Sequence, residues 1–245
     1  MNRGIYAAAT GMETSQAWLD VVTNNLANVS TNGFKRDDLL FNDALQKELA
    51  SNGGMGAPLG SIGSGATVAQ EYTSFDQGPI RITGNATDFA ISGVSASSPN
   101  TAAAFAVQTP EGVRYTRDGS FLVNDGALTT RDGYAVLDDS GSRITVPTGN
   151  LTTHGTQIMV NGKGVATLGV YAGSFAKLGG NLFSSSNAQA VSDVPVQSSA
   201  LEGSNVNAIG SMVDMIKIGR SYDLAQKSIT SQDELTQKLV QSLSS

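Results

Sequence analysis

The first thirty residues place small and apolar side chains at a regular seven-residue spacing. One row consists of Ile5, Met12, Leu19 and Leu26, and a second row consists of Ala8, Ser15, Val22 and Val29. Steps that alternate between three and four residues are typical of the seam of a coiled coil rather than of a general amphipathic face. With few charges and two internal glycines, a lone helix of this composition is marginal in water. The pattern therefore predicts an N-terminal helix that packs its stripe against another helix.

The C-terminal forty residues repeat the pattern. Two rows of residues recur every seven positions: Met215, Tyr222, Ile229, Thr236 and Leu243, and Ile218, Ala225, Gln232 and Leu239. The seam that they form is imperfect, because Gln232 and Thr236 are polar. Ser204 or Asn205 could cap a helix that runs to near residue 243. The two heptad helices could pair within one chain as a hairpin, or their seams could pack between subunits.

Between the ends the pattern changes to short strands. Residues 50–67 are rich in Gly and Ser, which indicates a flexible linker or an extended arm. From about Val68 to Ser199, strand-forming stretches are separated by Asp118-Gly119, Asp125-Gly126, Asp132-Gly133 and Asn161-Gly162, which are signals for type I′ hairpins. We therefore expect an α+β fold, in which long terminal heptad helices pack as a coiled coil and an antiparallel β-rich domain is inserted between them. The expected domains are 1–49 (N-terminal axial helix and docking corner), 50–67 (linker or arm), 68–200 (β-rich domain) and 201–245 (C-terminal axial helix, pairing with 1–30).

Composition narrows the functional classes. A net charge of −6 argues against a nucleic-acid surface, and no apolar stretch is long enough to predict membrane insertion. The chain has no cysteine and a single histidine, His154, so thiolate chemistry and multi-histidine metal sites are excluded. The aspartates of the Asp-Gly pairs are explained by turns, and GSIGSGAT at 60–67 lacks the order of a phosphate-binding loop. We expect no catalytic site, cofactor, metal or small-molecule substrate.

The segment NNLANVSTNGFKR at residues 24–36 is interpreted as a helix terminator and docking corner. Its three asparagine amides, Asn24, Asn25 and Asn28, can satisfy backbone groups or neighbouring chains near the helix end. Ser30 to Gly33 should end the helix, with Gly33 free to adopt a positive φ. Phe34 should then hold the returning segment against an apolar surface.

Both ends of the chain also carry motifs that resemble those of one known family. RGIYAAATGM at 3–12 with LDVVTNNLANVSTNGFKR at 19–36, and LEGSNVNAIGSMVDMIKIGRSYDLAQKSITSQDEL at 201–235, resemble the two terminal signatures of bacterial flagellar rod and hook proteins. YTSFDQGPIRITGNATDFAI at 72–91 and RYTRDGSFLVNDGALTTRDGYAVL at 114–137 are similar to the family's middle part. RGIY, IGSGA and YTSFDQGPIRITGN are most similar to proximal-rod members, with distal-rod and hook-type members as the alternative. The segment after TGNATDFAIS departs from the family, because it lacks the usual acidic, glycine-containing, double-aromatic stretch.

The resemblance implies a structural subunit of the flagellar basal-body rod, not an enzyme. It implies that the terminal helices form the axial tube, and that the partners are other rod subunits and the flagellar type III export apparatus. The implied location is the basal body outside the cytoplasm, reached without a cleaved signal peptide. The residues expected to pack between subunits are Ile5, Met12, Leu19, Val22, Asn24, Asn25, Leu26, Asn28, Gly33, Phe34, Met215, Ile218, Tyr222, Ile229 and Leu239. Outside this class, the β-rich domain could be a cell-wall-binding module, although an aromatic content of 6% disfavours a sugar-stacking face.

Replacing Leu19 or Leu26 with Ala should remove seam contacts, at a cost of about 2–5 kcal/mol for a fully buried side chain. We expect loss of motility while the β-rich domain remains folded, measured by swimming assays and by circular dichroism of the purified variant. The charged variant Leu19→Asp is the more severe form of the same test. Normal rod assembly in Leu19→Asp would contradict the predicted packing of this seam.

Overall fold

A computed structural model describes residues 3–43, 46–49, 60–63, 65–92, 101–147, 149, 151–191 and 194–243. The fold is α+β, with a helix at each end and a β-rich part between them, as the sequence predicts. The chain divides into two compact units. The helical unit consists of Met1–Leu26, Asp37–Tyr72 and Ala208–Ser245, and the β-rich unit consists of Ala27–Arg36 and Thr73–Asn207.

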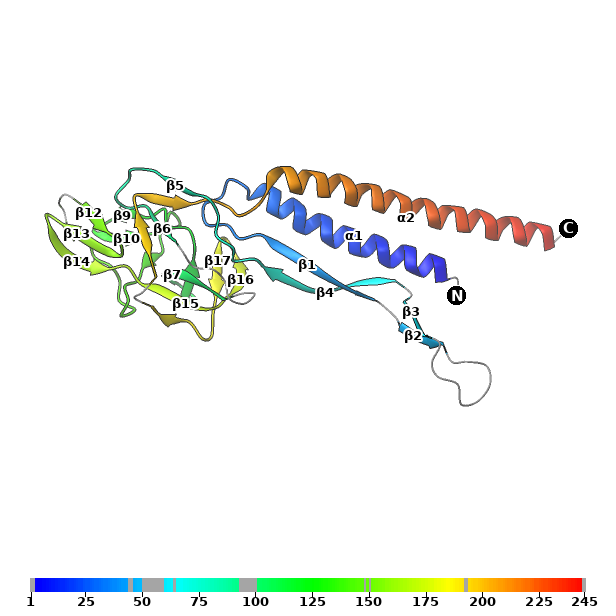
Figure 1. Cartoon of the computed structure of the whole chain (residues 1–245), viewed down its shortest axis with the longest axis horizontal. Helices are drawn as coiled ribbons and strands as arrows, with labels where there is room; N and C mark the ends of the chain where they lie inside the picture. Colours follow the sequence, from blue (N-terminus) through cyan, green and yellow to red (C-terminus); the bar gives the residue numbers. More distant parts are fainter. Residues whose placement is uncertain are drawn as a thin grey trace. The chain divides into compact units, whose positions relative to one another are not determined.

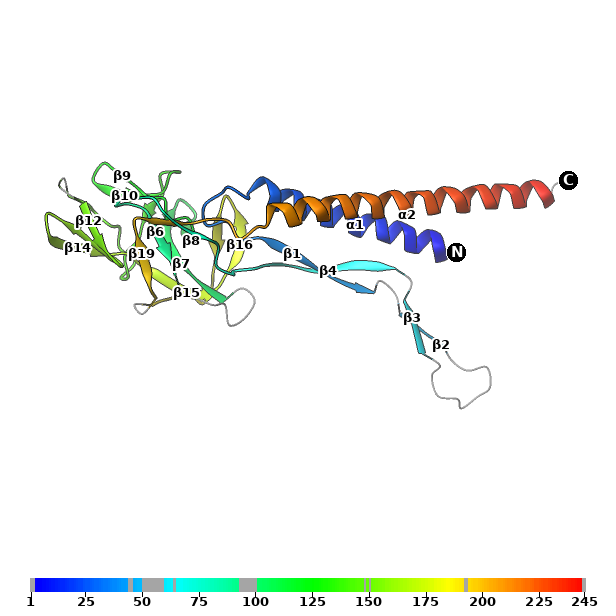
Figure 2. The same cartoon turned by 45° about the horizontal axis from the view of Figure 1, so that its top comes forward.

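Two helices dominate the helical unit. Helix α1 (Arg3–Ala27) and helix α2 (Ala208–Leu243) run side by side in opposite directions (Figures 1 and 2). They approach closely at Gly4, where a Cβ atom would lie 2.3 Å from Gln232 Nε2. On α2, Ile218 is buried, and Met215, Ala225 and Ile229 are half-buried. These are positions of the heptad rows that the sequence predicts.

An arm of antiparallel strands packs on α1 within the same unit. Strand β1 (Asp37–Asp43) pairs with β4 (Ala66–Thr73), and β2 (Gln46–Leu49) pairs with β3 (Gly60–Gly63). The rings of Trp18 and Phe41 meet edge to face with centroids 5.9 Å apart. Strands β3 and β4 therefore occupy part of the Gly- and Ser-rich segment 50–67 as an extended arm, whereas residues 50–59 lie outside the described part of the chain.

The β-rich unit is built around one long strand, β7 (Thr101–Thr109). Its Ala-rich sequence follows residues 93–100, which lie outside the described part of the chain. Strand β7 pairs antiparallel with β8, β11 and β15 in a sheet that comprises nine strands among the described residues. The other strands of this unit are β5 (Ile80–Ile82), β6 (Phe89–Ile91), β8 (Gly112–Thr116), β9 (Leu122–Asn124), β10 (Ala127–Thr129), β11 (Ala135–Val136), β12 (Leu151–His154), β13 (Gln157–Val160), β14 (Lys163–Thr167), β15 (Val170–Ser174), β16 (Ala176–Gly179), β17 (Leu182–Ser184), β18 (Gln189–Ala190), β19 (Val196–Ser198) and β20 (Ala200–Glu202).

Alternate residues of β7 face two different hydrophobic clusters. Ala103, Phe105 and Val107 belong to the larger cluster, which also contains Phe89 and Phe121. The residues between them, Ala102, Ala104 and Ala106, face a smaller cluster that contains Phe75, Phe175 and Phe183. Because successive side chains of a strand point to opposite faces, β7 is buried on both sides. The β-rich unit thus has a core of its own.

The Asp-Gly and Asn-Gly pairs that predict hairpin turns do not all form the same structure. Asp125-Gly126 and Asn161-Gly162 form two-residue hairpins in which both residues have a positive φ, as a type I′ turn requires. Asp132-Gly133 lies in a longer loop between the paired strands β10 and β11, and only its glycine has a positive φ.

The prediction for Asp118-Gly119 is wrong, because β8 and β9 do not pair with each other. Asp118 Oδ1 instead accepts hydrogen bonds from the amide and hydroxyl of Ser120. Gly119 lies against the backbone of Phe89, and Phe89 N donates a hydrogen bond to Gly119 O at 3.0 Å.

The predicted N-cap of the C-terminal helix is also wrong. Helix α2 begins at Ala208, so Asn207 stands at the capping position rather than Ser204 or Asn205. Ser204 Oγ accepts a hydrogen bond from Val206 N, and the Asn205 side chain binds other segments of the β-rich unit. Both side chains are therefore engaged before the helix begins.

Candidate functional site

Four segments that are far apart in the sequence converge on Glu202 in the β-rich unit. They are the turn after α1 (residues 32–36), the loop before β5 (74–79), the end of β8 with the following turn (116–119), and β20 with the following residues (200–205). We call the three charged side chains at their centre, Lys35, Arg117 and Glu202, the Glu202 network.

The Glu202 carboxylate faces both cations of the network. Lys35 Nζ lies 2.6 Å from Glu202 Oε1, and Arg117 Nε lies 3.0 Å from Glu202 Oε2. All three side chains are almost completely buried, with exposures of 0–1%. Glu202 Oε1 also accepts a hydrogen bond from Gly78 N at 2.9 Å.

Each of the two cations also donates a hydrogen bond to a backbone carbonyl. Lys35 Nζ donates to Asp76 O at 2.7 Å, and Arg117 Nη1 donates to Ala103 O at 2.8 Å on the central strand β7. A buried charge is tolerated only when it is paired and hydrogen-bonded. Removal of the carboxylate would leave two like charges buried side by side.

Burial also alters the acid–base behaviour of the lysine. Desolvation, followed in size by the nearby Arg117 charge, lowers the pKa of Lys35 from 10.5 to about 8, although Glu202 opposes this shift. Lys35 is therefore charged at neutral pH.

Backbone contacts hold the same four segments together. Gly33 N donates to Glu202 O at 2.7 Å, and Gly203 N donates to Pro79 O at 2.8 Å. Gly33 has a φ of +67°, and a Cβ there would lie 2.3 Å from the carbonyl carbon of Arg117. The predicted positive φ of Gly33 is confirmed, and the close approach to Arg117 is a second reason for glycine at this position.

Polar side chains add further contacts where the four segments meet, a place that we call the junction. Asn205 Oδ1 accepts from Arg36 N at 2.8 Å, while Asn205 Nδ2 donates to Ser74 O at 2.9 Å. Lys177 Nζ donates to Lys35 O at 2.9 Å and lies 3.9 Å from the centre of the Phe34 ring. Phe34 itself is buried. These contacts hold the residues that precede β1 and the residues that precede α2 in place within the β-rich unit.

The residues expected to pack between subunits fall into three groups. Gly33 and Phe34 lie in the junction. Val22, Asn25 and Ile218 are buried in the helical unit. Asn25 Nδ2 donates to Asp37 O at 2.8 Å and Asn25 Oδ1 accepts from Asp37 N at 3.0 Å, so this amide satisfies backbone groups of its own chain. The helix residues that keep partial or full exposure are Ile5, Met12, Leu19, Asn24, Leu26, Met215, Tyr222, Ile229 and Leu239, and Asn28 in the turn after α1 is half-buried.

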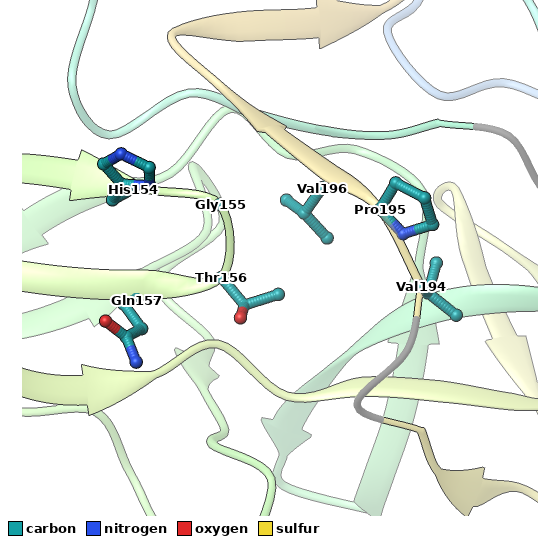
Figure 3. A pocket seen from close by; sticks show the side chains of 7 residues that line it. All are labelled: His154, Gly155, Thr156, Gln157, Val194, Pro195 and Val196. Atoms are coloured by element: carbon teal, nitrogen blue, oxygen red, sulfur yellow. The ribbon is translucent and has the colours of Figure 1, made fainter.

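The hollow around His154 offers little chemistry. It lies between the turn from β12 to β13 (His154, Gly155, Thr156, Gln157) and residues Val194, Pro195 and Val196, with a volume of about 470 Å³ (Figure 3). Its lining provides one imidazole, one hydroxyl and one amide, and no carboxylate or cation. Within the described ranges, no three His, Asp or Glu side chains gather as metal ligands. Neither helix of the described chain is long and apolar enough to cross a membrane.

Sequence reasoning missed the Glu202 network, although each of its members stands inside a motif singled out above: Lys35 in NGFKR, Arg117 in TRDG and Glu202 in LEG. The available signal was that each of these motifs contains a charged residue, although only 15% of the residues of the chain are charged.

Comparisons with known proteins agree with these motifs. Three family models match: "Flagella basal body rod protein" at residues 5–35, "Flagellar hook protein FlgE/F/G D1 domain" at 102–168, and "Flagellar basal body rod FlgEFG protein C-terminal" at 197–242. The chain is 32% identical to the flagellar basal-body rod protein FlgG of Bacillus subtilis, over 98% of each chain. It is 33% identical to FlgF of Caulobacter vibrioides, over 99% of this chain and 98% of the relative. It is 34% identical to FlgG of Agrobacterium fabrum, over 95% and 96%.

The substitution Glu202→Gln should lower the free energy of unfolding of the β-rich unit by about 3–5 kcal/mol, because it leaves Lys35 and Arg117 buried without a counter-charge. Urea denaturation followed by near-ultraviolet circular dichroism measures the change. The matched control is Glu111→Gln, since Glu111 is 82% exposed and its pair with Arg114 is a surface contact. Equal stabilities of the two variants would contradict the role of Glu202.

The lowered pKa of Lys35 predicts a pH dependence of stability. Between about pH 8 and pH 10.5 the folded chain releases the Lys35 proton while the unfolded chain retains it. The unfolded state then binds more protons, so stability rises with pH in this window. We expect the free energy of unfolding of the wild type to increase relative to Lys35→Met across the window in urea titrations, since other groups cancel in the difference. A difference that falls with pH would contradict the lowered pKa.

Proposed function

The chain belongs to the family of flagellar basal-body rod proteins, and we propose that, as a structural subunit of the rod, it polymerises through α1 and α2 into the torque-transmitting axial tube. The proposal gives each unit a separate task. The β-rich unit folds around its own core, and the helical unit supplies the surfaces that join neighbouring subunits.

The observation that carries the proposal is the unequal burial of apolar side chains. In the described part of the helical unit, Val22 and Ile218 are the only buried apolar side chains, whereas the β-rich unit buries two extensive clusters. The same helical unit exposes many large apolar side chains, among them Ile209, Ile216 and Leu239. Exposed apolar surface of this extent marks an interaction site. The helical unit therefore needs neighbours to complete its core.

We propose that the heptad rows form a coiled-coil seam that includes contacts between subunits. The half-burial of Ile5, Leu19 and Ile229 supports this, because half-buried apolar side chains can gain further contacts on assembly. A repeated heterologous contact that does not close on itself generates a helical filament. The β-rich unit would then lie outside the tube.

We also propose the proximal part of the rod as the position of this chain. The identities to FlgG and FlgF, 32% and 33%, are similar, so the support comes from RGIY, IGSGA and YTSFDQGPIRITGN. Passage through the flagellar type III export apparatus to a site outside the cytoplasm belongs to the same proposal. Cryo-electron tomography of basal bodies that carry a tag in the exposed loop at Ser140-Gly141 would locate the chain, and density at the distal end of the rod would contradict the proximal position.

The small core of the helical unit predicts that its helices become fully ordered only on assembly. Hydrogen exchange of the purified monomer should be fast at residues 1–30 and 205–245 and slow in β7, because folding of the ends is coupled to binding. In isolated basal bodies the same helices should be protected.

The β-rich core serves as the internal control, since its exchange should be the same in both samples. Slow exchange of both helices already in the monomer would contradict coupled folding. It would indicate a helical hairpin that forms before assembly.

A further inference from the structure

A hollow of about 350 Å³ lies beside the paired strands β5 and β20, and we call it the Arg81 hollow. Its lining includes Val29 and Asn32 near the end of α1, Arg81 of β5 and Leu201 of β20, and all of it belongs to the β-rich unit. Arg81 and Leu201 are directly opposed across the two strands, so their side chains lie on the same face. Glu202, the next residue of β20, points to the other face. The hollow is therefore distinct from the Glu202 network.

The Arg81 hollow combines an unpaired cation with apolar side chains. Arg81 is exposed, and within the described part of the chain its guanidinium has no ion pair and no hydrogen bond. Leu201 is 5% exposed and, together with Val29, makes part of the lining apolar. None of the described residues in the lining carries a carboxylate. A ligand that fits the hollow therefore brings its own carboxylate next to an apolar group.

Strand β5 has an open edge next to the hollow. Among the described strands it pairs only with β20, and Gly203 N donates to Pro79 O at one end of this pair. In the alternating pattern of an antiparallel pair, Arg81 then bonds to β20 as well, whereas the N–H and C=O groups of Ile80 and Ile82 point to the open edge. The Ile82 side chain is 75% exposed. The edge can therefore accept one more strand.

We propose that the open edge of β5 and the Arg81 hollow form a docking site for an extended acidic segment of another protein, which adds a strand to β5 and places a carboxylate on Arg81. Main-chain hydrogen bonds to Ile80 and Ile82 supply affinity, and the hollow supplies specificity. The residue of the segment opposite Arg81 points into the hollow, and its two neighbours point to the face of Ile82. The segment that fits has an acidic residue between two apolar, β-branched residues.

The register of β5 favours the ion pair. At the open edge Arg81 takes a non-hydrogen-bonded position, where facing Cα atoms lie about 4.5 Å apart instead of about 5.5 Å. The facing side chains are therefore close enough for a carboxylate to reach the guanidinium. The contact lies wholly within the β-rich unit, so it goes beyond the proposed polymerisation through α1 and α2 and does not depend on it.

A second copy of this chain does not offer such a segment. Of its 21 acidic residues, only Asp20, Asp214 and Asp223 stand between two apolar or aromatic residues. Asp20 lies within α1, and the other two lie within α2, so none of them is part of an extended strand. The partner that matches the site is therefore a different protein.

Binding of a defined peptide to the full-length monomer tests the site. The probe is the blocked peptide acetyl-Thr-Val-Glu-Val-Thr-amide, followed through the backbone amide signals of the isotope-labelled protein in two-dimensional nuclear magnetic resonance spectra. We expect the signals of residues 80–82 to shift on titration. Replacing the peptide's glutamate with glutamine should weaken binding by about tenfold, because a hydrogen bond to a charged group is lost. N-methylation of both valines should abolish binding, because it removes the donors of the added strand.

Charge reversal separates recognition by Arg81 from a general effect of charge. Arg81→Glu should lose the glutamate peptide and bind the corresponding lysine peptide, acetyl-Thr-Val-Lys-Val-Thr-amide. The matched control is Arg131→Glu, an exposed arginine in the loop between β10 and β11 of the same unit, which should bind the glutamate peptide as the wild type does. Because Arg81 is exposed and unpaired, the spectrum of Arg81→Glu should otherwise match that of the wild type.

Four results would overturn the docking site. They are no shifts at residues 80–82 with the glutamate peptide, equal binding of the glutamine peptide, equal shifts with N-acetylglutamate, and concentration-dependent shifts of the same signals without peptide. The third result would indicate a site for a free anion only, and the fourth would indicate that a second copy occupies the edge. The proposed function would stand in the first three cases, since they concern the monomer and leave polymerisation through α1 and α2 unaffected.

Discussion

The β-rich unit depends on one buried carboxylate. Glu202 compensates Lys35 and Arg117 at exposures of 0–1%, and neither cation could remain buried without it. The three residues come from the turn after α1, the end of β8 and the last strand before α2, so the network exists only when the whole unit is folded. Contacts with such long sequence separation make folding all-or-none. Beside the network, Arg36 N donates a hydrogen bond to Asn205 Oδ1, so the residues that precede β1 and those that precede α2 are joined within the β-rich unit.

The two units differ in how many apolar side chains they bury. In the β-rich unit, β7 is buried on both faces, and small alanines on one face allow the aromatic cluster of Phe75, Phe175 and Phe183 to pack close to the sheet. In the helical unit, polar contacts such as the Asn25–Asp37 pair define the local geometry, but few apolar side chains are buried. A partner that binds only the folded form of such a unit stabilises it further. This division suits a structural subunit of the rod, which assembles with other rod components.

Local sequence signals predicted local features well. Asp118-Gly119 failed because long-range packing decides its conformation: a Cβ on Gly119 would lie 1.7 Å from Phe89 O, so the glycine is needed for a close backbone approach rather than for a hairpin. The Glu202 network was not predicted from the sequence for the same reason. Nothing in the neighbourhood of Lys35 indicates that its partner lies 167 residues away.

The two helices of the helical unit differ in length. Helix α1 has 25 residues and α2 has 36, so an antiparallel pair leaves part of the longer seam uncovered. Gly4 of α1 lies against the side-chain amide of Gln232 of α2, and this contact marks where the first turn of α1 meets the longer helix. Residues 233–243 of α2 extend past Gly4 of α1, and Leu235, Leu239 and Leu243 in this part of the helix are exposed, so they are available to the contacts between subunits that we propose.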